Sequence, residues 1–153
     1  MPRRLRSGLV LLVFLFTGSL LLAQSNDMID SILTEEPATA GSAAYVALTA
    51  AELVSDDASR DRAVQVAVEA GWLPEDTSAE QPATFGQLAY LLMEAIEVQG
   101  GLMYRILPGP RYAAREFVYQ GWSPERRSPG EQVSGQFLIR VTGNFLDKVE
   151  VAP

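Results

Sequence analysis

A five-residue motif occurs twice in this chain with one substitution, and the repetition constrains the fold more than any other feature. GWLPE at residues 71–75 returns 50 positions later as GWSPE at 121–125. Each copy follows an alanine-bearing amphipathic stretch, and dropping one residue from the following loop aligns the apolar stretches that begin at 86–88 and 135–137. A repeated unit of this kind cannot bury its apolar stripe alone. We therefore expect the two copies to pack against each other.

Residues 1–23 have the pattern of an export signal. Three arginines within the first six residues precede an apolar run over 9–22, and Ala23 offers a small residue at the cleavage point. The run is shorter than the roughly 20 residues that a membrane-spanning helix needs. We expect a cleaved signal peptide and a periplasmic or envelope-associated mature chain, with a retained N-terminal anchor as the alternative.

Composition argues against several classes of site and partner. The chain has no cysteine and no histidine, which removes disulfides, thiolate nucleophiles, the commonest metal ligand and the commonest general base. We expect a bacterial protein that is not an enzyme and needs no cofactor or metal. Residues 24–104 carry 14 acids against two arginines, whereas 105–153 carry five acids against seven basic residues. The acidic first part argues against a nucleic-acid partner.

Apolar residues at helical spacing predict an all-α domain over 42–150, behind a flexible linker at 24–41 that has room for one helical turn at 28–33. No segment has a strand signal of comparable strength. The predicted helices cover residues 42–54, 58–70, 85–98, 111–120 and 134–149.

Local signals mark the ends of these helices. Asp56 or Asp57 is placed to cap the second helix. Thr84 and Gln87 have the spacing of a capping box for the third. The connector at 102–110 is too apolar for a solvated loop, so we expect it to pack against the bundle.

At residues 84–88 and 133–137 the chain resembles the S-layer homology (SLH) repeat. In that family a helix ending in glycine is followed by a loop with proline and then by a Thr-Arg-Ala-Glu-Phe-like motif at the beginning of a second helix. The resemblance covers about 45–148 and implies a small helical bundle of two diverged helix-loop-helix repeats, with part of a third, in a bacterial envelope protein. Phe85 and Ser134 stand where the family has an arginine that contributes to glycan binding, so the glycan site is not carried over.

Six residues are the candidate binding residues: Arg111, Arg115, Arg126, Arg127, Trp72 and Trp122. The four arginines, with Arg105 nearby, suit a phosphate, a carboxylate or an acidic protein surface. The alternative is a solvated face on which they pair with Glu116 and Glu125. Each tryptophan is placed to stack on a sugar, but we favour a role in filling the corner after its helix.

These observations predict a non-enzymatic, exported envelope protein whose helical domain is an interaction or scaffolding module for another envelope protein. The alternative is an SLH-like binder of cell-wall polysaccharide or peptidoglycan. Glu75 and Glu125 are equivalent acids, as glycoside hydrolysis requires, but both lie in solvated loops and this reading is disfavoured. Membrane contact is expected only through the N-terminal segment, if that segment is uncleaved.

Overall fold

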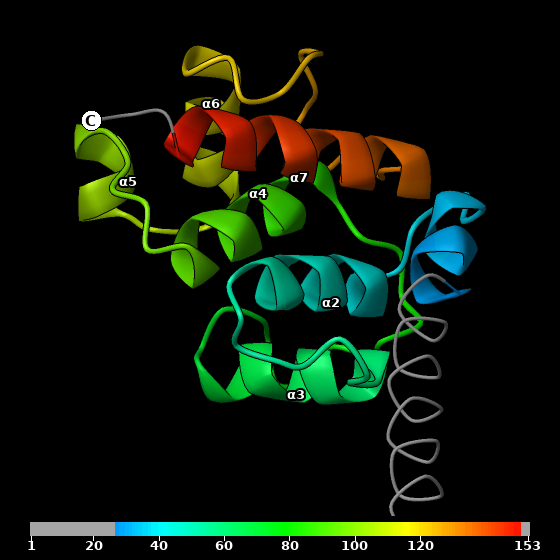
Figure 1. Ribbon diagram of the computed structural model, residues 1–153. Coiled ribbons are helices and arrows are strands. Elements are labelled where there is room, and N and C mark those ends of the chain that lie inside the picture. The colour runs from blue at the N-terminus through cyan, green and yellow to red at the C-terminus, as the bar shows by residue number, and fades with distance from the viewer. Residues whose placement is uncertain (1–26, 151–153) are drawn as a thin grey trace, which may run out of the picture.

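Helices and ordered loops make up the whole of the part of the chain that the structure describes, residues 27–150 of a computed structural model (Figure 1). A short helix at residues 27–33 is followed by α2 (Ala40–Ala50), α3 (Arg60–Glu69), α4 (Phe85–Ala95), α5 (Leu102–Ile106), α6 (Pro110–Tyr119) and α7 (Gly135–Glu150). Between residues 27 and 150 there is no sheet, only two isolated β-bridges. The all-α prediction is confirmed. The predicted signal peptide lies outside the described residues, and within them no helix has the length and apolar character needed to cross a membrane.

Helix α4 lies at the centre of the bundle. It packs against α2 on one side and against α6 on the other. Helix α3 lies beside α2, and α7 crosses the opposite side of α2, so that α7, α2 and α3 follow one another from top to bottom in Figure 1. Helix α5 contacts α6 and projects at the left of the view.

Aromatic side chains join α4, α6 and α7. The ring of Phe85, the first residue of α4, meets Phe117 edge-on at 6.3 Å and Phe137 at 5.9 Å between ring centroids. Phe117 also stacks on Phe145 at 4.9 Å. All four side chains are fully buried, and pairs of this geometry add to the stability that burial alone provides.

Three backbone segments close a ring of hydrogen bonds where α2, α4 and α7 begin. The amide of Ala38 donates to the carbonyl of Val133 at 2.8 Å, that of Ala83 to Ala38 at 2.8 Å, and that of Val133 to Ala83 at 3.2 Å. Each residue lies two positions before its helix, and all three are buried. The ring therefore ties together three helix starts that are far apart in the sequence.

The segment predicted as a flexible linker is part of the folded domain. Residues 27–33 are helical, and the Ile32 side chain is fully buried in the core. Arg60 binds Glu35 at 2.7 Å, and the amide of Gly135 donates to the Glu35 carbonyl at 3.0 Å. Gly135 lies so near Ile32 that a Cβ there would overlap the Ile32 carbonyl oxygen. The linker prediction for residues 27–41 was wrong because these contacts come from residues distant in sequence.

The predicted helices are found with shifted ends. Helix α2 begins two residues earlier than predicted and ends at Ala50, and α4 ends at Ala95. The capping box of Thr84 and Gln87 is confirmed. Helix α3 is capped by the Ser59 side chain, which accepts from the Arg62 amide, and not by Asp56 or Asp57.

The connector packs less than its composition suggested. It forms α5, in which only Tyr104 is buried. Its aliphatic side chains, at positions 102, 103, 106 and 107, are between 49% and 71% exposed. The prediction that this segment packs against the bundle is confirmed for Tyr104 and was wrong for these four side chains.

The two tryptophan-bearing corners have the same backbone geometry. Gly71 and Gly121 have φ angles of 77° and 68°, a left-handed conformation that glycine adopts at little cost. The amide of Trp72 donates to the carbonyl of Ala67 at 2.8 Å, and that of Trp122 donates to Phe117 at 2.9 Å. These are the bonds of a Schellman helix end.

The 50-residue spacing extends through the second helix of each pair. The side chain of Thr84 accepts from the third amide of α4, and that of Ser134 accepts from the third amide of α7. Phe85 and Gly135, the first residues of α4 and α7, are therefore also separated by 50 positions. No residue is dropped from the second loop, so the one-residue shift inferred from the sequence was wrong.

Candidate functional site

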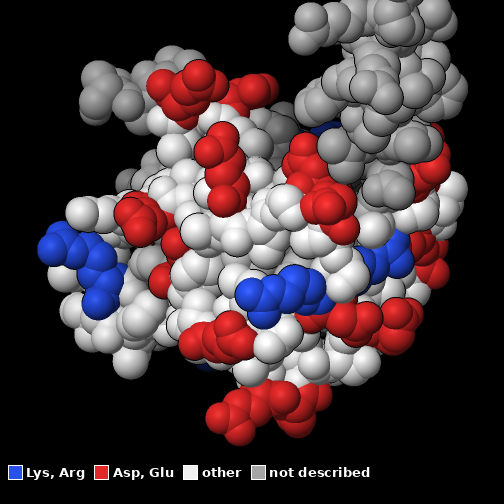
Figure 2. Space-filling model, turned by 60° about the horizontal axis from the view of Figure 1, so that its bottom comes forward, with Lys and Arg blue, Asp and Glu red and all other residues white. Residues whose placement is uncertain are grey.

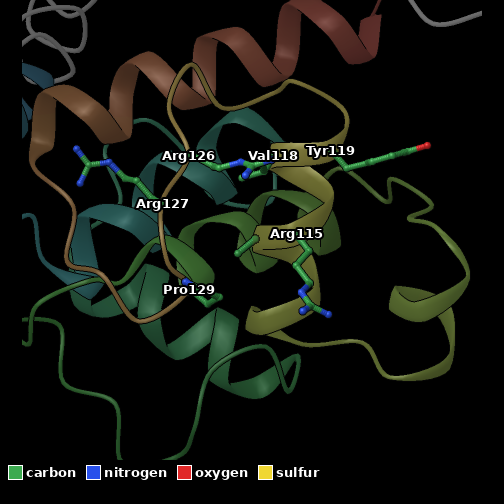
Figure 3. A pocket seen from close by; sticks show the side chains of 7 residues that line it. Arg115, Val118, Tyr119, Arg126, Arg127 and Pro129 are labelled. Carbon is green, nitrogen blue, oxygen red and sulfur yellow. The ribbon is translucent and has the colours of Figure 1, made fainter.

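A hollow lies between α6 and the loop that follows it. Its volume is about 620 Å³. It is lined by Ala114, Arg115, Val118, Tyr119, Arg126, Arg127 and Pro129, and we call it the arginine hollow. Figure 3 shows Arg115 and Arg126 on its α6 side, with Arg127 directed the other way, toward the beginning of α7.

Arg115 and Arg126 are the cations available in this hollow. Both are exposed, and within residues 27–150 neither forms an ion pair. The Arg115 guanidinium lies 5.9 Å from the centre of the Tyr112 ring. Tyr119, next to them, is 85% exposed. Two cations, a phenol and the small apolar floor of Ala114 can bind an anionic group.

Arg127 forms ion pairs with acids of its own loop, as the alternative of local pairing expected. It binds Glu125 at 3.1 Å and Glu131 at 2.6 Å, and its guanidinium lies 4.2 Å from the centre of the Phe137 ring. Glu125 is bound in turn by Arg140 at 2.8 Å. These contacts fix the loop against α7, and they occupy the acid that the sequence offered as one of a catalytic pair.

Arg111 does not line the arginine hollow. It is an exposed residue of the first turn of α6, and no ion pair involves it in the described part of the chain. Of the four predicted arginines, Arg115 and Arg126 line one hollow and form no ion pair among the described residues. Arg111 lies one turn before Arg115 and outside the hollow, and Arg127 is paired within its loop.

The two tryptophans differ although their corners match. Trp122 is 9% exposed, with its ring 5.3 Å from Phe117 and 5.0 Å from Phe145. The positions 50 residues before those phenylalanines are Ala67 and Ala95. With no aromatic neighbours there, Trp72 is only partly buried. The sequence contained this signal, because two alanines cannot fill the space of two phenylalanines.

Trp72 lines a second hollow of about 400 Å³, which we call the tryptophan hollow. Polar side chains from the end of α4 and from α5 complete its wall, including Glu94, Gln99, Tyr104 and Arg105. Sequence reasoning missed this site because its members are brought together only when α5 folds back beside α4.

Tyr104 and Glu94 form the strongest polar contact of the tryptophan hollow. The Tyr104 hydroxyl donates to Glu94 Oε1 at 2.5 Å, and its ring meets Tyr90 edge-on at 6.3 Å. Burial raises the pKa of Tyr104 well above its usual value, and the hydrogen bond to Glu94 and that residue's charge raise it further. Burial also raises the pKa of Tyr90, with a smaller contribution from Glu94. Tyr104 therefore remains a neutral hydrogen-bond donor at ordinary pH.

Among residues 27–150 no group of three or more acidic side chains is placed to hold a metal ion. Comparisons of the chain with protein-family models, with curated proteins and with solved structures found no match. The two hollows differ in their chemistry. The arginine hollow is cationic, and the tryptophan hollow combines aromatic rings with planar polar groups.

Proposed function

We propose that this protein is a non-enzymatic interaction module that binds an acidic surface of another envelope protein through the arginine hollow. The carrying observation is the exposed set of Arg115, Arg126 and Tyr119, whose cations have no acidic partner among the described residues. Arginine and tyrosine are the residue types that contribute most to protein interfaces. Unpaired cations on a chain of net charge −7 favour a partner that supplies the missing acids.

We also propose that the domain is built from diverged SLH-like helix-loop-helix repeats. The matching corners at Gly71 and Gly121 support this, as does the constant 50-residue spacing through both helix pairs. The hydrogen-bond ring adds a third helix start at Ala38, in keeping with an incomplete first unit. An envelope location rests on the export-signal pattern of residues 1–23.

Binding of cell-wall polysaccharide or peptidoglycan is the second candidate, and the tryptophan hollow favours it. A partly exposed indole with an amide, a carboxylate and a guanidinium beside it is suited to a sugar ring, since the ring has both an apolar face and hydroxyl groups. The two candidates use different hollows, so they are separable by mutation.

Capture from solubilised native envelope tests the leading proposal. The full chain carrying Arg115→Glu and Arg126→Glu is compared with the parent and with Arg62→Glu, which reverses an exposed arginine on α3. The captured protein is identified, purified and titrated against all three forms. We expect the double variant to bind at least about tenfold more weakly, since two contacts between opposite charges become repulsive, while the Arg62→Glu control binds as the parent does.

Sedimentation with purified wall material tests the second candidate. Binding that survives moderate salt, is lost in Trp72→Ala and is retained in the Arg115→Glu, Arg126→Glu variant would replace the leading proposal with the glycan one. Equal binding of the purified partner by the parent and the double variant would reject the arginine hollow as its docking site.

A further inference from the structure

Exposed aliphatic side chains are concentrated in one short segment of this protein. Among residues 27–150, six large hydrophobic side chains are exposed, and four of them lie within 102–107: Leu102 at 71%, Met103 at 49%, Ile106 at 60% and Leu107 at 53%. Single exposed hydrophobic residues are ordinary, but a cluster marks a surface that contacts something. Tyr104 is the one buried residue of α5, so the helix is anchored through this side chain and exposes Leu102, Met103, Ile106 and Arg105.

Along the sequence this segment is basic, although in space Glu94 and Glu97 line the hollow beside Arg105 and Glu116 lies against Gly101. Residues 98–115 contain three arginines and no aspartate or glutamate, in a protein with 19 acids and 12 basic residues. Arg105 lies within the aliphatic segment and Arg111 lies four residues after its end; both are exposed, and neither forms an ion pair within the described residues. In Figure 2 a basic patch at the left end of the molecule has uncharged surface below it and an acidic side chain beside it, and the rest of that face carries both acidic and basic side chains.

The size and shape of the cluster decide what kind of surface suits it. A stable protein interface buries about 1,200–2,000 Å² in total, which a helix of five residues does not supply. A lipid bilayer requires no matching pocket. It accepts a few aliphatic side chains at the boundary between headgroups and acyl chains, and anionic headgroups attract the nearby cations.

We propose that α5 is a membrane-contacting element. The aliphatic side chains of residues 102–107 enter the interface of an anionic bilayer, and Arg105 and Arg111 extend their guanidinium groups to lipid phosphates, with their aliphatic stems along the apolar layer. This contact is separate from the arginine hollow, because it uses neither Arg115 nor Arg126. It is also separate from any contact made by the N-terminal apolar run, and it places the domain against the membrane in one orientation.

A single environment-sensitive fluorophore tests the proposal on the full chain. The natural chain has no cysteine, so Met103→Cys and, in a second variant, Leu53→Cys each provide one labelling site. The two side chains are matched, being 49% and 48% exposed, but Leu53 follows Glu52 in an acidic segment. Each labelled protein is mixed with vesicles of phosphatidylcholine containing phosphatidylglycerol, and with vesicles of phosphatidylcholine alone.

We expect emission from the label at 103 to move to shorter wavelength with the anionic vesicles, and less or not at all with the neutral ones. The label at 53 should not change with either. The label reports the depth of α5 itself, so attachment of the full chain through its N-terminal segment does not imitate the result. Adding Leu102→Ser and Ile106→Ser should lower the equilibrium constant for insertion of α5 into anionic vesicles at least about tenfold. Leu53→Ser should leave this constant unchanged.

Three results would overturn the proposal. One is an unchanged label at 103 on anionic vesicles. Another is a blue shift without lipid that grows with protein concentration, which would assign the cluster to a second copy of the chain. The third is a shift produced by the purified envelope partner and not by lipid, which would make α5 part of the protein interface.

Discussion

The helix pairs at residues 60–95 and 110–145 have one backbone plan and two different interiors. Both first helices end in the same left-handed glycine, and both second helices begin at a capping side chain 13 residues later. In the second pair, Phe117 and Phe145 enclose the corner tryptophan. In the first pair alanines leave it at the edge of a hollow. The corner geometry is therefore independent of whether its tryptophan is enclosed.

The surfaces of the two pairs differ as much as their interiors. Arg115 and Arg126 in the second pair correspond to Gln65 and Asp76 in the first. One face carries two cations where its counterpart carries an amide and an acid, although the same turns support both. A few glycine, capping and buried positions therefore set the framework, while the exposed positions differ between the two pairs.

Truncating the tryptophans should show the largest difference between the pairs. Trp122→Ala removes a ring packed between two phenylalanines and should lower the free energy of unfolding by about 3–5 kcal/mol. Trp72→Ala should cost about half of that or less, because the side chain is only partly buried. Urea denaturation of the two variants measures both values. Equal costs would contradict the claim that the interiors differ.

Replacing the corner glycines should instead give matching effects. Gly71→Ala and Gly121→Ala each place a β-carbon on a backbone with positive φ, at an expected cost of about 1 kcal/mol. An added β-carbon has no close neighbour at 71, and at 121 only the flexible end of Lys148 at 3.4 Å. Thermal or urea unfolding should therefore give the same loss for both. A loss at only one corner would show that the two are not equivalent.

The stability of the protein at alkaline pH should depend on Tyr104, which lines the tryptophan hollow. The pKa of Tyr104 is higher in the folded chain than in the unfolded one, so its contribution to stability is present below about pH 10 and is lost as the pH rises beyond that value. Unfolding free energies measured from pH 7 upward should fall less steeply in Tyr104→Phe than in the parent. Tyr119→Phe is the control, since its exposed hydroxyl is not held by the fold.

Reversing charge on α6 should have the smallest effect on stability and a large one on binding. Arg111→Glu with Arg115→Glu alters two exposed side chains that form no ion pair in the described region, so the free energy of unfolding should change by about 0.5 kcal/mol or less. Capture of the envelope partner should weaken, and more so at low salt. A large fall in melting temperature would identify these arginines as structural and remove Arg115 from the proposed site.

Much of the framework was predictable because its signals are local. The stop at Gly121 and the capping box at Thr84 depend on residues within a few positions of each other, and both are present in the structure. The cationic character of α6 was predictable for the same reason. Which arginines remain available was not, because Arg127 is occupied by Glu131 four residues on and by the Phe137 ring across the loop.

The wrong prediction of a flexible linker also arose because the deciding contacts are not local in the sequence. A polar segment with proline and small residues is typical of a loop, and nothing within it shows that Ile32 fills the core or that Glu35 binds Arg60. Such contacts become visible only when the positions of α3 and α7 are known.

By itself the sequence determined the five longer helices, the glycine stops at 71 and 121, the capping box at Thr84, the repeated corner and the uneven distribution of charge, because each depends on neighbours along the chain. Tertiary structure alone decided the hydrogen-bond ring at Ala38, Ala83 and Val133, the enclosure of one tryptophan and not the other, and the exposure of α5. These features depend on the positions of atoms separated by tens of residues, and packing in three dimensions brings those atoms together.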